Sequence, residues 1–554
     1  MTILSPDRSF VTCAAMTSIL RGRRWVLAFA IAVMLVTSLP YILGFTAQGD
    51  GWRFTGFVFA VEDGNSYIAK MLSGSAGAWF FRTPYTADPQ RGVLAFLPYL
   101  LLGKLAAPVG LHEQLAAIFH TFRFAAGCLV LLATYDFLAF FLDDERLRRW
   151  GLVVAALGGG LGWVLLLIGR DMWMGSMPLE FYSPEAFGFL ALYGIPHLAV
   201  ARAAMLWGLL IYLRATVPGG QHGWQVALKA GVCWLVAALF QPLTALVMGM
   251  VFGVHLLALG VRNLWKQRRM QGADWEGWRR AVRFVLLAFI IPAPFLVYNT
   301  LAFSLDPYLQ TWTAQNLILS PSFTHYLLAY VLLLPFLPLG ARNLLRERPW
   351  AGWMLIAWVL AFPLLAYAPV NLQRRLVEGV WLALVVISAY YVRSKTQPGL
   401  SWRSYQLTSF LIFPSTIILL AIGIIASSRP SIPLFHPAQE TAAYEYLAKI
   451  ATPGSVVLAS YRTGNALPAW APVRVLIGHG PESAKLDSLQ PRLQHIFQTG
   501  TKDEERRAFL GDFRISYLFY GPAEMSLGGW DPATAAYLEN IYERGPYTIY
   551  RVEE

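Results

Sequence analysis

Apolar runs of about twenty residues recur along most of this chain, and they constrain its fold more than any other feature. A run of that length crosses the hydrocarbon core of a bilayer as one α-helix. Of the 554 residues, 56% are hydrophobic and only 14% are charged, whereas about a quarter of a soluble protein is charged. The sequence therefore predicts a polytopic α-helical membrane protein.

The basic residues predict the orientation of these runs. The formal net charge is +12, and it gathers in short clusters between the apolar runs, as the positive-inside pattern requires. This distribution argues against a nucleic acid as the partner of the basic residues. Arg21, Arg23 and Arg24 precede the first run, 25–45, which is too long for a cleavable signal peptide and lacks an A-x-A site. We therefore expect residues 1–24 to lie in the cytoplasm.

The alternation of basic clusters predicts about eleven spans, with the amino terminus inside and the carboxyl terminus outside. The segment 93–109 is short and contains Lys104, so we expect an interfacial helix there and one long outer loop over 46–114. The predicted spans are 25–45, 115–141, 150–168, 197–214, 226–241, 243–261, 284–302, 325–341, 350–368, 376–392 and 405–427.

The composition changes after Ser428, so 25–427 is the predicted transmembrane domain and 428–554 a small extracytoplasmic α/β domain. Its strand candidates are "SVVLAS", "VRVLIG", "ISYLFYG" and "YTIYRV". Because they alternate with helical stretches, a largely parallel sheet is expected. The loops "TGNALPAW" and "VLIGHGPES" match neither a dinucleotide fingerprint nor a P-loop. We interpret this domain as an acceptor-side or structural module.

Two adjacent carboxylates, Glu62 and Asp63, follow the first apolar run. In one interpretation Asp63, Asn65 or Ser66 caps a helix through "SYIAKML". In the other, one carboxylate is a general base that takes a proton from an incoming hydroxyl or amine. Neighbours on a helix point about 100° apart, so one should act and the other support it. Partial withdrawal from water should raise the pKa of Asp63 toward the working pH.

Arg374 and Arg375, in "APVNLQRRLVEGVW", break the charge rule because they fall on the predicted outer side. They are either interface anchors, with Glu378 one helical turn away as a partner, or ligands of a phosphate, which suits the guanidinium fork. Lys70 and Arg82 in the first loop are further candidate cations.

Two further polar residues are expected in or near outer loops. His197 stands at the outer end of the fourth predicted span, where it is either a packing residue or a ligand of a metal ion or of the donor phosphate. Gln315 is a candidate contact for a sugar.

The order of these features resembles the GT-C superfamily of integral membrane glycosyltransferases, especially its aminoarabinose transferase and protein O-mannosyltransferase branch. The resemblance covers about residues 25–145 and includes "YIAKMLSGSAGAW", "LPYLLLGKL" and "FRFAAGCLVLLATYDF". In that branch an Asp stands four residues before a Tyr, as Asp63 does before Tyr67, and an Arg opens the second span, matched by Arg123. Many relatives carry Glu after that Asp, whereas here Glu62 precedes it, which leaves the role of the second carboxylate open.

The resemblance implies an inverting transfer of a sugar from a polyprenyl-phosphate donor to an acceptor, a glycan, lipid or protein, on the outer face of the membrane. Separately, the Ala/Leu-rich chain without targeting signals favours a prokaryotic plasma membrane. Asp63 would be the base, and Glu62 would orient the acceptor, a metal or the loop. Some GT-C enzymes use a divalent ion, such as Mg or Mn, for which Asp63 and His197 are candidate ligands.

Three other functions are compatible with parts of the sequence. A transporter would show inverted repeats and charged spans near the midplane, whereas the charges here gather at the outer rim. A polysaccharide polymerase or ligase would use outer-loop arginines but does not predict the early acidic motif. A catalytically silent GT-C-like scaffold would have the same pattern as an enzyme.

Overall fold

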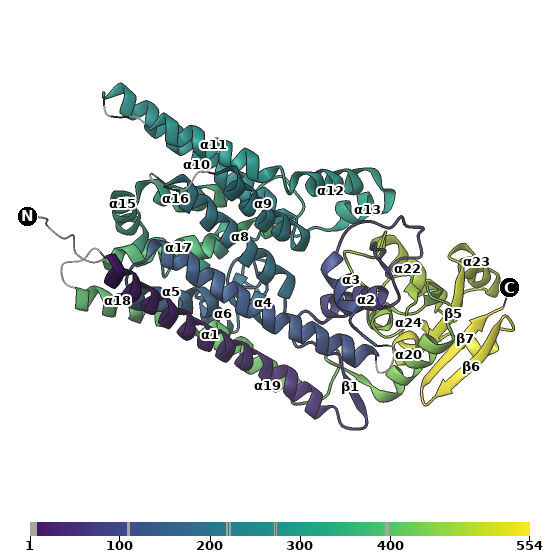
Figure 1. The fold of residues 1–554 in the computed structure, drawn as a ribbon. Helices are drawn as coiled ribbons and strands as arrows, with labels where there is room; N and C mark the ends of the chain where they lie inside the picture. Colours follow the sequence, from purple (N-terminus) through teal and green to yellow (C-terminus); the bar gives the residue numbers. More distant parts are fainter. Residues whose placement is uncertain are drawn as a thin grey trace, which may run out of the picture.

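The computed structural model describes residues 8–107, 111–217, 220, 223–270, 272, 274–393 and 398–553. Long helices pack side by side, and a sheet-containing C-terminal region covers one end of them (Figure 1). The first helix, α1 (Arg8–Ala47), begins at the opposite end. The start of the bundle and the C-terminal region are therefore separated by the length of the helices.

Within the described part of the chain, seven helices are long and apolar enough to cross a membrane, or up to nine if two bent pairs each form one span. The chain is therefore a multi-pass membrane protein. The seven are Arg23–Ala47 of α1, α4 (Leu111–Phe141), α8 (Pro196–Thr216), α10 (Leu243–Arg268), α16 (Pro349–Ala366), Gln373–Arg393 and Trp402–Ser427. The bent pairs are α11 (Trp275–Phe289) with α12 (Ala293–Leu305), at 59°, and α14 (Phe323–Tyr330) with Leu334–Glu347, at 73°.

Two of the eleven predicted spans are not among these long helices of the described residues. The segment 150–168 is divided between α5 (Glu145–Leu157) and α6 (Gly162–Leu167). Three glycines separate these helices, and a Cβ on Gly160 would lie only 2.6 Å from the Cα atom of Ala329. The segment 226–241 forms α9 (Trp224–Phe240), an apolar helix of 17 residues.

The first loop folds between the helical bundle and the C-terminal region (Figure 1). It contains β1 (Trp52–Phe54), α2 (Val61–Ser75) and α3 (Leu97–Gly103). Among the described residues of the predicted interfacial segment, 93–107, only α3 is helical, and it has a buried face with Tyr99 and an exposed face with Leu101. Helices α2 and α3 lie so close that a Cβ on Gly103 would meet the carbonyl oxygen of Met71 at 1.8 Å.

The C-terminal region holds a five-stranded sheet of order β4-β3-β5-β7-β6. The parallel strands are β3 (Val456–Leu458), β4 (Arg474–Val475) and β5 (Ile515–Tyr520). β7 (Tyr547–Val552) runs antiparallel to both β5 and β6 (Leu538–Arg544). The sheet is therefore mixed rather than largely parallel. The sequence did not predict β6 because its largely exposed residues carry little apolar alternation.

The first loop and the C-terminal region form one packed unit. β1 pairs antiparallel with β2 (Phe435–Pro437). One hydrophobic cluster joins Ile68 and Met71 of α2 to Leu467 and Phe519 of the C-terminal region. Burial of these side chains contributes about 25 cal/mol of free energy per Å² of apolar surface, and it stabilises the packing of α2 against the C-terminal region.

The remaining elements complete the bundle and cover the sheet. In the first part of the chain they are η1 (Leu179–Phe181), α7 (Phe189–Tyr193), α13 (Pro307–Gln315), η2 (Leu334–Phe336), α15 (Leu337–Glu347), η3 (Gln373–Val377), α17 (Val380–Arg393), α18 (Pro398–Phe410) and α19 (Pro414–Ser427). In the C-terminal region they are α20 (Ala438–Ile450), α21 (Tyr461–Ala466), η4 (Leu467–Ala469), α22 (Leu486–Ile496), α23 (Asp503–Asp512), α24 (Pro522–Gly528) and η5 (Pro532–Thr534).

Candidate active site

The acidic motif lies in the first turn of α2. The helix begins at Val61, and the preceding Ala60 has a left-handed backbone with no side-chain cap. Asp63, Asn65 and Ser66 are therefore inside the helix, and the interpretation of these residues as caps is wrong. The helix dipole favours a carboxylate in this first turn.

Asp63 presents an accessible carboxylate. Half of its side chain is exposed, and its Oδ1 atom lies 3.3 Å from Nε2 of His479. Burial of the group raises the pKa of Asp63, but the hydrogen bond and charge of His479, together with the charges of Arg375 and Lys70, outweigh it and lower the pKa below its ordinary value. The predicted rise is therefore wrong, because local sequence does not reveal these cations. Asp63 is ionised at neutral pH.

Glu62 points to α21 of the C-terminal region rather than to His479. Its exposed side chain accepts a hydrogen bond from the Tyr461 hydroxyl at 3.1 Å. Its carbonyl oxygen accepts one from Nδ2 of Asn465 at 3.4 Å. The two neighbouring carboxylates thus have different partners, as their angular separation on a helix predicts.

Lys70 lies two turns farther along α2 and is buried. Its Nζ atom is 2.6 Å from Oε1 of Glu482, and the two side chains are 1% and 3% exposed. The same carboxylate accepts hydrogen bonds from Ser66 and Thr83, each at 2.6 Å. The Lys70 ammonium also lies 4.4 Å from the centre of the Phe96 ring. Lys70 is therefore a buried ion-pair partner that joins α2 to the C-terminal region.

Tyr67, one turn after Asp63, connects the acidic motif to α8. Its ring stacks on Tyr99, with centroids 4.7 Å apart, and meets the edge of His197 at 5.5 Å. The Tyr99 hydroxyl lies 2.8 Å from Nδ1 of His197. The Asp-to-Tyr spacing that the sequence shares with the GT-C branch therefore places Asp63 one helical turn from an aromatic and imidazole cluster.

Tyr99, His197 and Arg375 line a groove of about 350 Å³ among α3, α8, α9, α12 and η3. Most of its wall is apolar, and a few amides interrupt it. Such a groove suits an elongated apolar molecule with an anionic head, because Arg375 is a charged group in the wall. The apolar and aromatic lining includes Phe96, Leu239, Phe240, Phe295, Phe303 and Trp312, and the amides are Gln241, Asn299 and Asn316.

The two adjacent arginines of η3 have different surroundings. Arg375 lines the groove, is 36% exposed, and has a carboxylate oxygen of Glu185 at 3.9 Å. The Arg374 guanidinium instead lies 4.5 Å from the centre of the Tyr182 ring. Glu378, the expected partner in the anchor interpretation, is paired with Arg202. Arg375 is therefore the better placed of the two for an anionic ligand in the groove.

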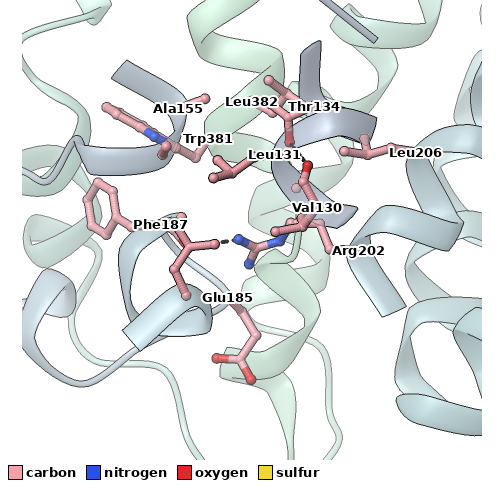
Figure 2. Close-up of a pocket in the computed structure, with 14 residues that line it drawn as sticks. Val130, Leu131, Thr134, Ala155, Glu185, Phe187, Arg202, Leu206, Trp381 and Leu382 are labelled. Carbon is pink, nitrogen blue, oxygen red and sulfur yellow. Dashed lines mark hydrogen bonds between the residues drawn. The ribbon is translucent and has the colours of Figure 1, made fainter. Parts of the chain in front are cut away.

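Arg202, the partner of Glu378, is held in place by several hydrogen bonds. It donates hydrogen bonds to the Phe187 carbonyl at 3.1 Å and to Oε2 of Glu378 at 3.1 Å. Figure 2 shows Arg202 and Glu185 at a small internal cavity. That cavity measures about 30 Å³, which is room for water and not for a substrate. Arg202 is therefore a buried structural charge.

Both polar atoms of the Gln315 side-chain amide form hydrogen bonds with one loop of the C-terminal region. Its Nε2 atom donates to the Ser483 carbonyl at 2.6 Å, and its Oε1 atom accepts from the Lys485 amide at 3.1 Å. Arg82 is exposed in the first loop. Contacts of Gln315 with a sugar and of Arg82 or Lys70 with a phosphate stay predictions.

The C-terminal region supplies site residues that the sequence did not predict. Tyr461 and Asn465 follow β3, and His479 and Glu482 follow β4. β3 lies between β4 and β5, so these residues stand at the carboxyl ends of parallel strands, where open sheets bind ligands. The occurrence of His and Glu in the strand-following loop "VLIGHGPES" was the available signal. Here the first turns of α2 occupy that edge of the sheet.

Within the described ranges, no group of three or more His, Cys, Asp or Glu side chains has an arrangement that could hold a metal ion. Nδ1 of His197 faces Tyr99, and Oδ1 of Asp63 faces His479. These residues do not form a metal-binding set. Their predicted role as ligands of Mg or Mn stays a prediction.

No protein-family model matches the sequence, and no curated protein matches it significantly. Solved structures of membrane enzymes share its fold. The archaeal oligosaccharyltransferase AglB from Archaeoglobus fulgidus, in complex with an inhibitory peptide and a dolichol-phosphate, is 12% identical with a TM-score of 0.53 over 96% of this chain and 74% of its own. ArnT from Cupriavidus metallidurans, bound to undecaprenyl phosphate, is 12% identical with a TM-score of 0.50 over 94% and 97%.

The arabinofuranosyltransferase AftD from Mycobacteria is 16% identical with a TM-score of 0.50, over 96% of this chain and 40% of its own. At such identities the likeness concerns the fold alone. All three are GT-C enzymes, and each alignment covers both the helical bundle and most of the C-terminal region. The chain therefore has the fold of the GT-C superfamily of membrane glycosyltransferases.

Proposed function

We propose that this protein is an inverting glycosyltransferase that moves a sugar from a polyprenyl-phosphate donor to an acceptor on the outer face of the membrane. The observation that carries the proposal is the position of Asp63. Its accessible, ionised carboxylate is linked through Tyr67 to Tyr99 and His197, which line an apolar groove containing Arg375.

The groove supports a lipid-linked donor. Its aromatic and aliphatic wall suits a prenyl chain, and Arg375 can pair with the phosphate as a guanidinium does. Two proteins of the same fold were solved with such lipids, ArnT with undecaprenyl phosphate and AglB with dolichol-phosphate. In this proposal the apolar residues bind the tail and the charged residues hold the head near α2.

The reaction follows from this placement. Asp63 removes the proton of an acceptor hydroxyl or amine. The acceptor atom then bonds to the anomeric carbon from the face opposite the phosphate, the bond from that carbon to the phosphate oxygen breaks, and the configuration inverts. The proton ends on Asp63, and the negative charge of the leaving phosphate is stabilised by Arg375. No step is assigned to a metal ion, because the described residues do not form a set that fits one.

The proposed orientation follows the charge alternation. Residues 1–24 lie in the cytoplasm of a prokaryotic cell, and the first loop and residues 428–554 lie outside its plasma membrane. The acceptor is a glycan, a lipid or a protein. It reaches Asp63 from the side of Glu62, whose exposed carboxylate stands at the junction with the C-terminal region.

The test is an assay of the purified, full-length protein with a panel of polyprenyl-phosphate sugars and membrane extracts as acceptors. Release of free polyprenyl phosphate by the wild type, and its loss in Asp63→Asn, is the expected result. Parallel reactions with EDTA, Mg²⁺ and Mn²⁺ test the metal. Binding of a donor lipid without release of lipid phosphate would identify the protein as a catalytically silent scaffold. Vesicle uptake of a solute without transfer identifies a transporter, and growth of a long polymer identifies a polymerase.

A further inference from the structure

Four charged side chains form a continuous line from the interior of the first-loop interface to the accessible carboxylate of α2. Lys70 lies 2.6 Å from Glu482, Glu482 lies 3.5 Å from Nδ1 of His479, and Nε2 of His479 lies 3.3 Å from Asp63. The exposed fractions of the four side chains are 1%, 3%, 7% and 50%. Asp63 is thus the only member of this line that a substrate can reach.

The two ring nitrogens of His479 both face carboxylate oxygens. Ionised carboxylates only accept hydrogen bonds, so the imidazolium form provides a proton toward each of them. The contact of Nδ1 with Glu482 is within ion-pair distance, although it lacks the geometry of a hydrogen bond. With an imidazolium, the two negative and two positive charges of the line balance.

The surroundings of His479 hold its ring in place. Its backbone amide donates to the Ser483 hydroxyl at 3.0 Å, and the Tyr85 ring lies 5.5 Å from its own. The loop that carries it is attached to α13 through Gln315 and through the Tyr308 hydroxyl, which donates to the Glu482 carbonyl at 2.8 Å. A side chain held by so many contacts is suited to orienting a second group.

We propose that His479 is a positioning residue of the catalytic centre: it fixes the Asp63 carboxylate through Oδ1 and leaves Oδ2 free for the acceptor proton, while Glu482 and Lys70 fix His479. This inference rests on the proposed role of Asp63 as the base. It makes the C-terminal region part of the catalytic site rather than a separate structural module.

The charges that face Asp63 are those of His479, Arg375 and Lys70. Those that face His479 are Asp63 on α2 and Glu482 in its own loop, with Lys70 behind Glu482 and the Tyr85 hydroxyl as a further titratable group. The contribution of His479 to the lowered pKa of Asp63 is lost when its side chain is replaced, so burial acts on Asp63 with less opposition and the carboxylate should protonate at a higher pH.

The first experiment needs no turnover. Thermal unfolding of the full-length protein is measured for His479→Gln, Asp63→Asn and the double variant, because a double-mutant cycle isolates the interaction of two residues. We expect His479→Gln to lower Tm by roughly 1–3 °C more in the wild type than in the Asp63→Asn background. Equal effects in both backgrounds would overturn the inference. The matched control is His495→Gln, an exposed histidine of the same region that is paired with Glu505.

The second experiment is the pH profile of kcat. Gln at position 479 keeps a donor for Oδ1 but has no charge, so the acid limb should move up by about one to three pH units while KM for the donor lipid stays within about twofold. His495→Gln should leave the limb unmoved. A uniform loss of activity in His479→Gln, with an unmoved limb, would mean a merely structural role.

The two proposals fail in different ways. If the wild type releases no lipid phosphate from any donor, the proposed function fails, and the thermal cycle still decides whether His479 and Asp63 interact. If the wild type and Asp63→Asn behave as expected but the cycle shows no coupling, only the role of His479 is overturned.

Discussion

Oδ1 of Asp63 lies 3.3 Å from Nε2 of His479, although 416 residues separate the two in the chain. Asp63 is placed by the first turn of α2, and His479 by the loop that follows β4. Neither segment forms the proposed site alone, because one carries the accessible carboxylate and the other the residue that we propose orients it. The proposed catalytic centre is thus shared between the first loop and the C-terminal region.

Asp63→Asn should abolish sugar transfer without unfolding the protein. Asn keeps the shape of the side chain but cannot accept a proton, so the rate should fall by about 10²–10⁴-fold. Rate and Tm are measured together, beside Glu62→Gln, which should retain most activity because Glu62 faces Tyr461. Turnover by Asp63→Asn at the wild-type rate would disprove the assignment. An inactive Glu62→Gln beside an active Asp63→Asn would reverse the two roles.

Arg375→Ala should weaken use of the donor lipid by about ten- to hundredfold, which corresponds to roughly 1.5–3 kcal/mol for one charge-assisted contact. Arg374→Ala is the matched control, because that guanidinium lies over Tyr182 and is not in the groove lining. Donor saturation curves of both variants provide the measurement. Identical curves for Arg375→Ala and the wild type would return Arg375 to the role of an interface anchor.

Lys70→Met should destabilise the protein strongly, because it leaves the buried Glu482 carboxylate without its cation. Removal of one partner of a buried pair costs about 3–5 kcal/mol. The double variant Lys70→Met/Glu482→Leu should recover most of that loss, since no charge is then left unpaired. Thermal unfolding of the two variants makes the comparison, and a double variant as unstable as the single one would contradict it.

The pair of Lys70 and Glu482 also determines whether the stability of the protein rises or falls with pH. Burial raises the pKa of Glu482, but the charges of Lys70 and His479 and the hydrogen bonds from Lys70 and Ser66 outweigh it and lower the pKa. Its contribution to stability is therefore present above the unfolded carboxyl pKa of about 4.3 and is lost as the pH falls through the lower folded pKa. The double variant Lys70→Met/Glu482→Leu should therefore lack this part of the acid dependence of Tm that the wild type shows.

Filling the groove should compete with the donor lipid. Thr300 lines the groove from α12 and is exposed, so Thr300→Trp can occupy the space without disturbing a core. Leu305→Trp is the control, at a 72% exposed position of the same helix outside the groove lining. We expect a higher KM for the donor in Thr300→Trp alone. An unchanged KM in both variants would place the lipid elsewhere.

Cysteine labelling tests the orientation. In a background without native cysteines, a membrane-impermeant maleimide should label Asp88→Cys in the first loop from outside the cell. It should label Met270→Cys, at a 97% exposed position between α10 and α11, only after the membrane is permeabilised. The reverse pattern would place the first loop in the cytoplasm and would remove the basis for an outer-face reaction.

The sequence predicted those parts of the molecule that depend on local pattern. Apolar length predicted the membrane class, and the angle between neighbouring helix positions predicted that Glu62 and Asp63 have different partners. The eleven predicted spans exceed the seven to nine long apolar helices of the described residues, because hydropathy cannot distinguish one continuous helix from α5 and α6, which three glycines separate.

The rest of the site depends on contacts that no local pattern encodes. His479 and Glu482 reach α2 only because β3 and β4 are parallel neighbours whose carboxyl ends face the first loop. For the same reason the direction of the shift in the pKa of Asp63 was predicted wrongly. Desolvation can be anticipated from an apolar context, whereas the cations that oppose it come from distant segments.

The pairing of Lys70 with Glu482 also fixes an order of events during synthesis. The two residues are 412 positions apart, so at ribosomal rates Lys70 is made roughly 20–80 s before its partner. Throughout that interval its ammonium has no carboxylate to be buried with, and α2 must keep it in contact with water. The interface can close only after the loop with His479 has been made. A nascent chain that has not reached Glu482 has its membrane helices but lacks half of the proposed site, so chain elongation sets the earliest time at which that site can form.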